Sequence, residues 1–323
     1  MTASSAGRTV GTALGGLGAV AVGALAWGTL VERSRFTVRQ ETVPLLDAGA
    51  RPLTVLHLAD LHMAPWQRDK QEWIRELAFL EPDLVISTGD NLGHADGIEG
   101  VEYALEPFRG VPGVYVNGSN DYFGPVVKNP FAYFGAKVRH DPERVGRLNT
   151  GELESFYESL GWLSLNNTAR AMSLKGSRFE FVGVNDAHLG WDRLDAIPGA
   201  MDEMRENVGW QDDRVGPEAV TIGVTHSPYQ RVLNSFVNHG AQLIFAGHTH
   251  GGQVCVPGIG ALITNCDLPR SQASGLSHWY HGLNAAYLNV SAGLGTSIFA
   301  PVRFACPPEA VLVTLTPDDI GYS

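Results

Sequence analysis

The chain has 323 residues, of which 44% are hydrophobic and 18% are charged, enough for one large α/β domain or two small ones. A net charge of −11 excludes the strongly basic surface that nucleic-acid binding needs, and an acidic protein that handles phosphate requires a cation such as a metal ion. Cys255, Cys266 and Cys306 form no C-x-x-C pair, so we expect three buried thiols.

The first 35 residues differ in composition from the rest. Val10 to Val31 is a run of 22 residues without a charge, long enough to cross a bilayer as a helix. We therefore predict that residues 1–35 are a membrane anchor, a single span in the cell membrane; a signal segment cleaved near Ala24-Leu25-Ala26 is the alternative. Arginines follow the run at positions 33, 35 and 39, which does not favour export, and the sequence leaves open which side the catalytic part faces.

Beyond residue 35, short apolar runs alternate with helix-like segments. Residues 36–52 are predicted to be a linker with a first strand, because apolar and polar residues alternate there. Helices are predicted at 67–80 and 228–238. Further strands are expected at 53–58, 83–88, 113–117, 179–184, 220–225, 242–247, 285–290 and 310–315. This alternation predicts an α/β domain over residues 53–317.

Five of the apolar runs end in residue types that bind metals. In chain order the ends read D-x-H (60–62), G-D (89–90), G-S-N-D (118–121), T-H (225–226) and G-H-T-H (247–250). Sites in open α/β sheets lie at the carboxyl ends of strands. Each motif alone is weak, since Asp90 could be a helix N-cap and His226 a core histidine. The ordered set predicts a metal centre.

The ligand types indicate which ions bind. Carboxylate, imidazole and amide ligands without thiolate suit manganese, iron or zinc. About seven ligands are too many for one tetrahedral ion but fit two ions that share a carboxylate. Two such ions leave a positive excess that attracts phosphate, and ions about 3.5–4 Å apart can activate a water and bind both phosphoryl oxygens.

On these motifs the chain resembles the calcineurin-like metallophosphoesterases over about residues 53–315. The runs G-H-T-H-G-G-Q (247–253), G-L-G-T (293–296) and R-F-A-C-P-P-E (303–309) are similar to those of a bacterial branch whose members often carry an N-terminal membrane segment. The resemblance implies a four-layer α/β/β/α sandwich of two mixed sheets with a dinuclear metal centre between the loops.

The resemblance also implies a role for each motif residue. The implied metal ligands are Asp60, His62 and His250 for the first ion, Asp90 as the bridge, and His226 and His248 with an asparagine oxygen for the second ion. The family pattern at that asparagine is Gly-Asn-His followed by an acid, whereas this chain reads Gly118-Ser119-Asn120-Asp121. Either Ser119 is the ligand and Asn120 replaces the histidine, or Asn120 is the ligand. We predict Asn120, because its amide oxygen is the better donor to a hard ion.

The histidine that helps the leaving group depart in this family is therefore absent. General-acid help is typically worth about 10²–10⁴-fold, so a substitute would matter. We name His94 and His188 as candidate proton donors, and expect Asn120 to stabilise the charge that develops during the reaction.

The sequence predicts a hydrolase, a membrane-anchored dinuclear phosphoesterase. A metal-activated water would cleave a phosphomonoester, phosphodiester or pyrophosphate bond, and attachment to a membrane favours a lipid or cell-envelope substrate. A catalytically weak or inactive metal-binding scaffold of the same fold is the alternative. Amidohydrolases and metallo-β-lactamases fit less well, because they begin with H-x-H, whereas this chain opens with D-x-H and closes with H-x-H.

Overall fold

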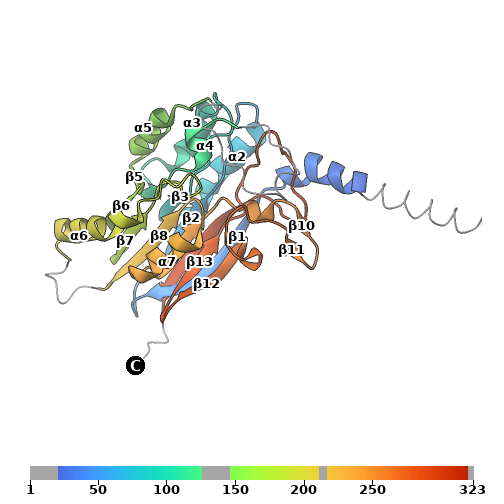
Figure 1. Ribbon diagram of the computed structural model, residues 1–323. Helices are drawn as coiled ribbons and strands as arrows, with labels where there is room; N and C mark the ends of the chain where they lie inside the picture. Colours follow the sequence, from blue (N-terminus) through green and yellow to red (C-terminus); the bar gives the residue numbers. More distant parts are fainter. Residues whose placement is uncertain (1–20, 126–145, 211–216, 319–323) are drawn as a thin grey trace, which may run out of the picture.

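The computed structural model of the protein describes residues 21–125, 146–210 and 217–318. Two six-stranded sheets lie face to face, and helices cover the outer face of each (Figure 1). Both sheets mix parallel and antiparallel strands. The predicted four-layer α/β/β/α sandwich is thus confirmed.

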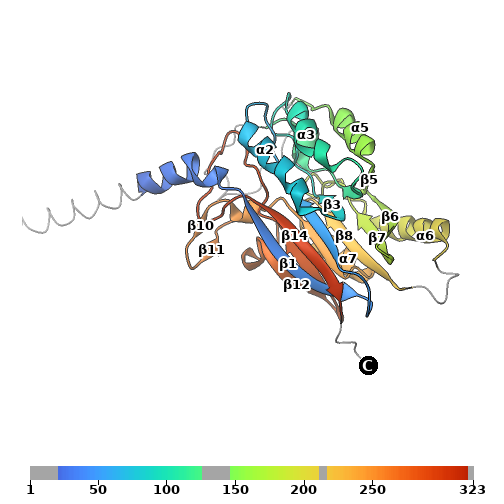
Figure 2. The same ribbon diagram turned by 180° about the vertical axis from the view of Figure 1, so that it is seen from behind.

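The first sheet has the strand order β1-β14-β2-β3-β4-β5. The bounds are Thr37–Leu46 (β1), Leu53–Leu58 (β2), Leu84–Ser87 (β3), Gly113–Tyr115 (β4), Trp162–Ser164 (β5) and Glu309–Pro317 (β14). Strands β2 to β5 are parallel, and β14 pairs antiparallel with β2 and parallel with β1. The first and last of these strands in the chain are therefore neighbours at the sheet edge (Figure 2).

The second sheet has the order β12-β13-β9-β8-β7-β6. The bounds are Thr168–Leu174 (β6), Ser177–Gly183 (β7), Ala219–Thr225 (β8), Leu243–Ala246 (β9), Gly275–His281 (β12) and Asn284–Val290 (β13). The four central strands are parallel, and the two edge strands β6 and β12 pair antiparallel. A separate short hairpin consists of β10 (Cys255–Val256) and β11 (Gly260–Ala261).

Helices separate the sheets from solvent. The α-helices are α2 (Arg68–Glu76), α3 (Ile98–Leu105), α4 (Ser119–Tyr122), α5 (Thr150–Leu160), α6 (Ile197–Val208) and α7 (Gln230–Asn238). Short 3₁₀ turns occupy Glu32–Ser34, Leu77–Leu80, Glu106–Phe108, Leu194–Ala196, His250–Gly252 and Arg270–Gln272. Helices α2, α3 and α5 pack on the first sheet, and α6 and α7 pack on the second.

Strand β2 shows how the layers arise from the sequence. Its side chains alternate between two faces, as the period of a strand requires. Leu56 and Leu58 pack with the residues of the helices, whereas Leu53 and Val55 join the apolar layer between the two sheets. All four are buried, so β2 presents apolar side chains to both faces of the sheet rather than to one.

The predicted strands coincide with observed ones to within about three residues. The predicted helix 67–80 is α2 followed by a 3₁₀ turn, Leu77–Leu80. The expectation of three buried thiols was wrong for one of them, because Cys266 lies half-buried in the loop after β11, while Cys255 and Cys306 are buried.

The predicted membrane anchor lies partly outside the described residues, so the span stays a prediction. Residues 21–30 are helical (Figure 1). Within the described ranges, no helix has both the length and the apolar character needed to cross a bilayer. Two contacts tie this end of the chain to the loop before β14: the amide of Arg303 donates to the carbonyl of Gly28 at 3.1 Å, and the amide of Cys306 donates to the carboxylate of Glu32 at 2.7 Å.

Candidate metal centre

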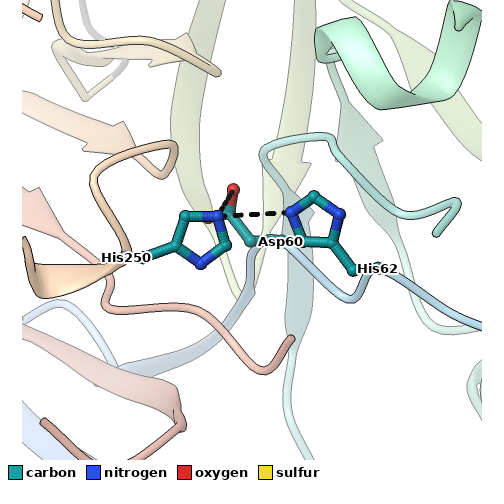
Figure 3. Close-up of side chains that lie close together, drawn as sticks. All are labelled: Asp60, His62 and His250. Atoms are coloured by element: carbon teal, nitrogen blue, oxygen red, sulfur yellow. Dashed lines mark hydrogen bonds and ion pairs between the residues drawn. The ribbon is translucent and has the colours of Figure 1, made fainter. Parts of the chain in front are cut away.

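The loops that follow β2, β3, β4, β8 and β9 meet at one end of the two sheets. They bring together six of the predicted ligands: Asp60, His62, Asp90, His226, His248 and His250. Two groups have their ligand atoms within 4.8 Å of one another, Asp60 with His62 and His250, and Asp60 with Asp90 and His226. Figure 3 shows the first group, in which the three side chains point toward one another.

The backbone at this cluster is strained. Among the described residues, eleven non-glycine residues have a positive φ, and five of them belong to the six predicted ligands just named: Asp60 (51°), His62 (40°), Asp90 (55°), His248 (68°) and His250 (50°). This conformation is uncommon for residues with a Cβ, and it clusters at functional sites because the surrounding structure must stabilise it. The strain therefore supports a functional role for these loops.

In the first group, two imidazole nitrogens lie close together. The Nε2 atoms of His62 and His250 lie 3.2 Å apart, and His250 Nε2 lies 3.6 Å from Asp60 Oδ1 (Figure 3). His62 Nε2 also lies 3.6 Å from Asp90 Oδ2. Asp90 thus extends the first group toward the second sheet.

The second group is arranged around the other oxygen of Asp90. His226 Nε2 lies 3.5 Å from Asp90 Oδ1 and 3.2 Å from His248 Nδ1. One carboxylate therefore faces His62 with one oxygen and His226 with the other. This is the position that a bridging carboxylate would occupy.

Backbone carbonyls contact one ring nitrogen in three of the four histidines. His226 Nδ1 lies 2.8 Å from the carbonyl of Thr88, His250 Nδ1 lies 3.2 Å from that of Gly295, and His248 Nε2 lies 3.4 Å from that of Asn265. A carbonyl only accepts, so Nδ1 of the neutral His226 ring donates to Thr88 and its Nε2 bears the lone pair. His248 Nε2 lies equally close to the carboxamide nitrogen of Asn265, and His250 Nδ1 lies 3.5 Å from the guanidinium of Arg303, so these two contacts select no tautomer. His226 Nε2 faces His248 Nδ1 at 3.2 Å, so the space between these two nitrogens must hold a proton or a metal ion.

The charges in the cluster show that the residues fit a cation. Burial alone would lower the pKa of His226, but the carboxylates of Asp90, Asp60 and Asp186 outweigh it and raise this pKa to about 9. Burial also raises the pKa of Asp60 to about 7. Without divalent ions a proton therefore takes the place between these groups, and divalent cations would displace it.

The third strand end contributes through Asn120. Its amide nitrogen lies 2.8 Å from Asp90 Oδ1, and its carboxamide Nδ2 lies 2.6 Å from Asp90 Oδ2. A Cβ at Gly118 would overlap Asp90 Oδ1, so only glycine allows this approach. Of the two candidate ligands Ser119 and Asn120, it is Asn120 whose side chain contacts Asp90.

The two candidate proton donors lie in different surroundings. The ring of His188 lies 4.7 Å from that of His248, and its Nδ1 lies 3.0 Å from the hydroxyl of Tyr229. His94, by contrast, packs edge-on against Trp66 at 5.2 Å, and its Nδ1 accepts from the amide of Asp96 at 3.1 Å. The structure brings His188 to the cluster and places His94 among residues outside it.

Three buried charged residues that hold the loops of the centre were not predicted from the sequence. Asp121 accepts from the amides of Asp90 at 2.9 Å and Asn91 at 2.7 Å, and Lys70 donates to the carbonyl of Leu61. Arg303 is fully buried and donates to the carbonyls of Ala292, Gly293 and Gly295 at 2.7, 3.0 and 2.7 Å. Asp121 lies in the run G-S-N-D (118–121) and Arg303 in the run R-F-A-C-P-P-E (303–309). Their place in these motifs was the one sequence signal for a role at the site.

Arg303 is joined to the first metal group through one shared acceptor. The carbonyl of Gly295 faces both the guanidinium of Arg303 and Nδ1 of His250. The amide of Gly295 in turn donates to the carbonyl of Asp60 at 2.6 Å. Arg303 therefore orders the loop that orients His250 and packs against Asp60.

Comparison with known proteins agrees with the geometry. The family model described as calcineurin-like phosphoesterase matches residues 53–252. The chain is 28% identical over 283 residues to the protein YpbG of Bacillus subtilis, covering 86% of this chain and 87% of that one. It is 22% identical over 315 residues to the metallophosphoesterase YkuE of the same species, covering 93% and 95%.

Among solved structures, the NAD nucleotidase NadN of Haemophilus influenzae is similar at 10% identity, with a TM-score of 0.42, over 76% of this chain and 51% of that chain. A dimetal phosphatase from Danio rerio is similar at 10% identity, with a TM-score of 0.38, over 75% and 88%.

Proposed function

Because this chain belongs to the calcineurin-like phosphoesterase family, we propose that it is a dinuclear metal-dependent phosphoesterase. It would hydrolyse a phosphomonoester, phosphodiester or pyrophosphate bond. The observation that supports this most directly is the pair of imidazole nitrogens, His226 Nε2 and His248 Nδ1, that lie 3.2 Å apart beside the carboxylate of Asp90. The donor set of carboxylate, imidazole and amide suits manganese, iron or zinc.

The proposed ligand roles follow the two groups of side chains. Asp60, His62 and His250 would hold the first ion, Asp90 would bridge, and His226, His248 and Asn120 would hold the second. Bound there, the ions would supply a nucleophilic water at neutral pH and neutralise charge on the phosphoryl oxygens.

The remaining chemistry belongs to residues of the chain. Asn120 lies against Asp90, and rotation of its carboxamide by half a turn would exchange its nitrogen for its oxygen. An amide is no acid, so Asn120 cannot supply the proton transfer of the histidine that this chain lacks. Its role would be to bind and to stabilise developing charge.

We assign the proton donor to His188. Its ring borders His248, the hydroxyl of Tyr229 contacts its Nδ1, and the carboxylate of Asp186 accepts from its backbone amide at 2.8 Å. These contacts hold an imidazole at the rim of the centre, where a leaving group would depart. His94 has no comparable contact among the described residues.

The substrate class is proposed from the sequence, which predicts attachment to a membrane. A predicted N-terminal span would hold the chain at a membrane and favour a lipid or cell-envelope phosphate. The alternative, a catalytically weak or inactive scaffold, would keep the same ligands and turn over no ester.

The deciding experiment combines metal analysis with hydrolysis. The protein is loaded with Mn²⁺, its metal content is measured, and aryl phosphate monoesters and diesters are supplied. We expect two ions per chain and turnover that Asp90→Asn abolishes, while Asp96→Asn, an exposed neighbour, leaves both unchanged. Two ions without turnover would favour the scaffold; no more than one ion in folded protein would refute the dinuclear centre.

A further inference from the structure

Large apolar side chains are exposed at the end of the molecule that carries the N-terminal helix. They come from three segments: the helix (Leu25 59% exposed, Leu30 73%), the β10–β11 hairpin and its flanks (Val254 37%, Ile259 74%, Leu262 37%) and the loop before β14 (Phe299 49%). We call these six residues the apolar surface. Isolated exposed apolar residues are ordinary, but a group of them marks an interaction site.

Backbone contacts show that the three segments are adjacent. Val254 forms a bridge with Phe304, and the amide of Cys255 donates to the carbonyl of Phe304 at 2.8 Å. The preceding residue, Arg303, donates from its backbone amide to the carbonyl of Gly28 in the helix. Figures 1 and 2 show the helix beside β10 and β11 from both sides. The apolar surface is therefore one region of the molecule.

This region also lacks charge in its own sequence. Residues 9–31, 251–266 and 271–302 contain no Asp, Glu, Lys or Arg, although 57 of the 323 residues are charged (23 basic plus 34 acidic). The three segments of the apolar surface belong to these runs. The residues before the first described one, 9–20, continue the uncharged run in the sequence, so the chain reaches the apolar surface from an apolar segment.

Exposed arginines flank the apolar surface in a protein whose net charge is −11. Arg33 and Arg35 follow the helix, and Arg270 donates to the carbonyl of Leu262 at 3.5 Å. Apolar side chains with a basic rim match a bilayer, whose hydrocarbon accepts the former and whose anionic headgroups attract the latter. A second copy of this chain is also acidic, but it does not combine a hydrocarbon layer with a plane of anionic groups as a bilayer does.

We propose that the apolar surface rests on an anionic lipid bilayer. The contact would be made by the β10–β11 hairpin and Phe299 as well as by the N-terminal helix, so it goes beyond a single anchoring span. The turn His250–Gly252 leads directly into β10, and Gly295 lies four residues before Phe299. The metal centre would thus stand close to the headgroup layer.

A fluorophore placed at single positions tests the contact. In a Cys266→Ser background, the variants Ile259→Cys and Phe299→Cys of the full chain are labelled with an environment-sensitive NBD probe and mixed with vesicles of phosphatidylglycerol and phosphatidylcholine. Leu283→Cys is the matched control, because Leu283 is fully exposed on the β12–β13 hairpin, outside the apolar surface. We expect a blue shift and quenching by nitroxide-labelled lipid at 259 and 299, but not at 283.

Two results would overturn the proposal. Labels at 259 and 299 that respond no more than the label at 283 would show that the hairpin and loop stay in water, whatever the N-terminal segment does. A blue shift without vesicles that grows with protein concentration would show that a second copy covers the surface. No turnover is measured, so failure here is separate from failure of the proposed function.

The arginine rim gives an independent readout. Replacing Arg33 or Arg270 with glutamine should lower the apparent vesicle affinity, followed by the label at 259, about fivefold each. Arg193→Gln is the control, since its side chain is exposed beside Asp195, apart from the apolar surface. Equal affinities for all three variants would remove the electrostatic part of the proposal.

Discussion

The two sides of the metal centre differ in how closely they keep the family pattern. The first side, with Asp60, His62 and His250, carries every implied ligand in a strained and well-supported backbone. The second side includes the strand end Gly118 to Asp121, which keeps the supporting glycine and acid but has Ser119-Asn120 in place of the family's Asn-His pair. Coordination needs a particular donor atom at a particular point, whereas a proton can come from any acid that reaches the leaving group.

The ligand side should tolerate substitution least. We expect His250→Ala to lose the first ion and to reduce phosphoester hydrolysis by on the order of 10³-fold or more, because metal assistance contributes several kcal/mol to the transition state. His278→Ala, an exposed histidine on β12, should change neither. Metal content and turnover of an aryl diester measure the effect; two bound ions in His250→Ala would remove His250 from the ligand set.

The rate of hydrolysis should depend on the proton donor only for substrates with poor leaving groups. His188→Ala is expected to slow hydrolysis of an alkyl phosphate about 10²-fold, and to have little effect on a nitrophenyl ester, which needs no acid. His94→Ala should leave both rates nearly unchanged. The ratio of the two rates, measured for each variant, is the readout. Equal ratios in His188→Ala and the unaltered protein would mean that the donor lies elsewhere.

Substitutions can separate the roles of the two adjacent residues Ser119 and Asn120. Asn120→Ala should weaken binding of the second ion by about 10–100-fold, whereas Ser119→Ala should weaken it little, because Asn120 is the residue that contacts Asp90. Titration of the metal-free protein with Mn²⁺ measures both affinities. The reverse order of effects would make Ser119 the ligand and Asn120 the histidine's replacement.

Arg303 should act on the first side alone. Arg303→Met removes the donor that orders the carbonyls of Ala292, Gly293 and Gly295, so the first ion is expected to bind about tenfold more weakly while the second is unaffected. Arg303→Lys should restore part of the loss. Thermal unfolding of the metal-free variants separates a general loss of stability from this effect: equal weakening of both ions would indicate the former.

The smallest effect concerns protons on the second side. The carboxylates raise the pKa of His226 in the metal-free protein above its ordinary value, to about 9. At pH 7 this imidazole is therefore protonated, and it must lose the proton before it can bind an ion. Metal affinity should rise with pH up to about 9, by no more than about tenfold per pH unit for this one proton. Calorimetry in buffers of different ionisation enthalpy would show the released proton; no buffer dependence would contradict it.

Features that depend on a local pattern could be predicted from the sequence, whereas features that depend on partners outside that pattern could not. Nine of the fourteen strands in the described residues, and the five motif-bearing ends, could be predicted because each depends on a short local pattern, and parallel strands bring their carboxyl ends together. Strands β5, β6, β10, β11 and β12 were not predicted. The supporting residues could not be predicted, since their roles depend on partners outside the local motif: Asp121 accepts from an amide 31 residues earlier, and the guanidinium of Arg303 binds three carbonyls eight to eleven residues earlier in its own loop. The pairing of β1 with β14, about 270 residues apart, has no local signature either.

That pairing has a practical consequence for any shortened version of the protein. A fragment that starts at residue 53, where the family match begins, would lack β1 and leave one edge of β14 unpaired over nine residues, although β14 would still pair with β2. It would also leave Glu309 without the guanidinium of Arg39, 3.1 Å away. A newly opened, apolar sheet edge invites aggregation. The cut that removes the apolar N-terminus while keeping the fold soluble belongs before Glu32.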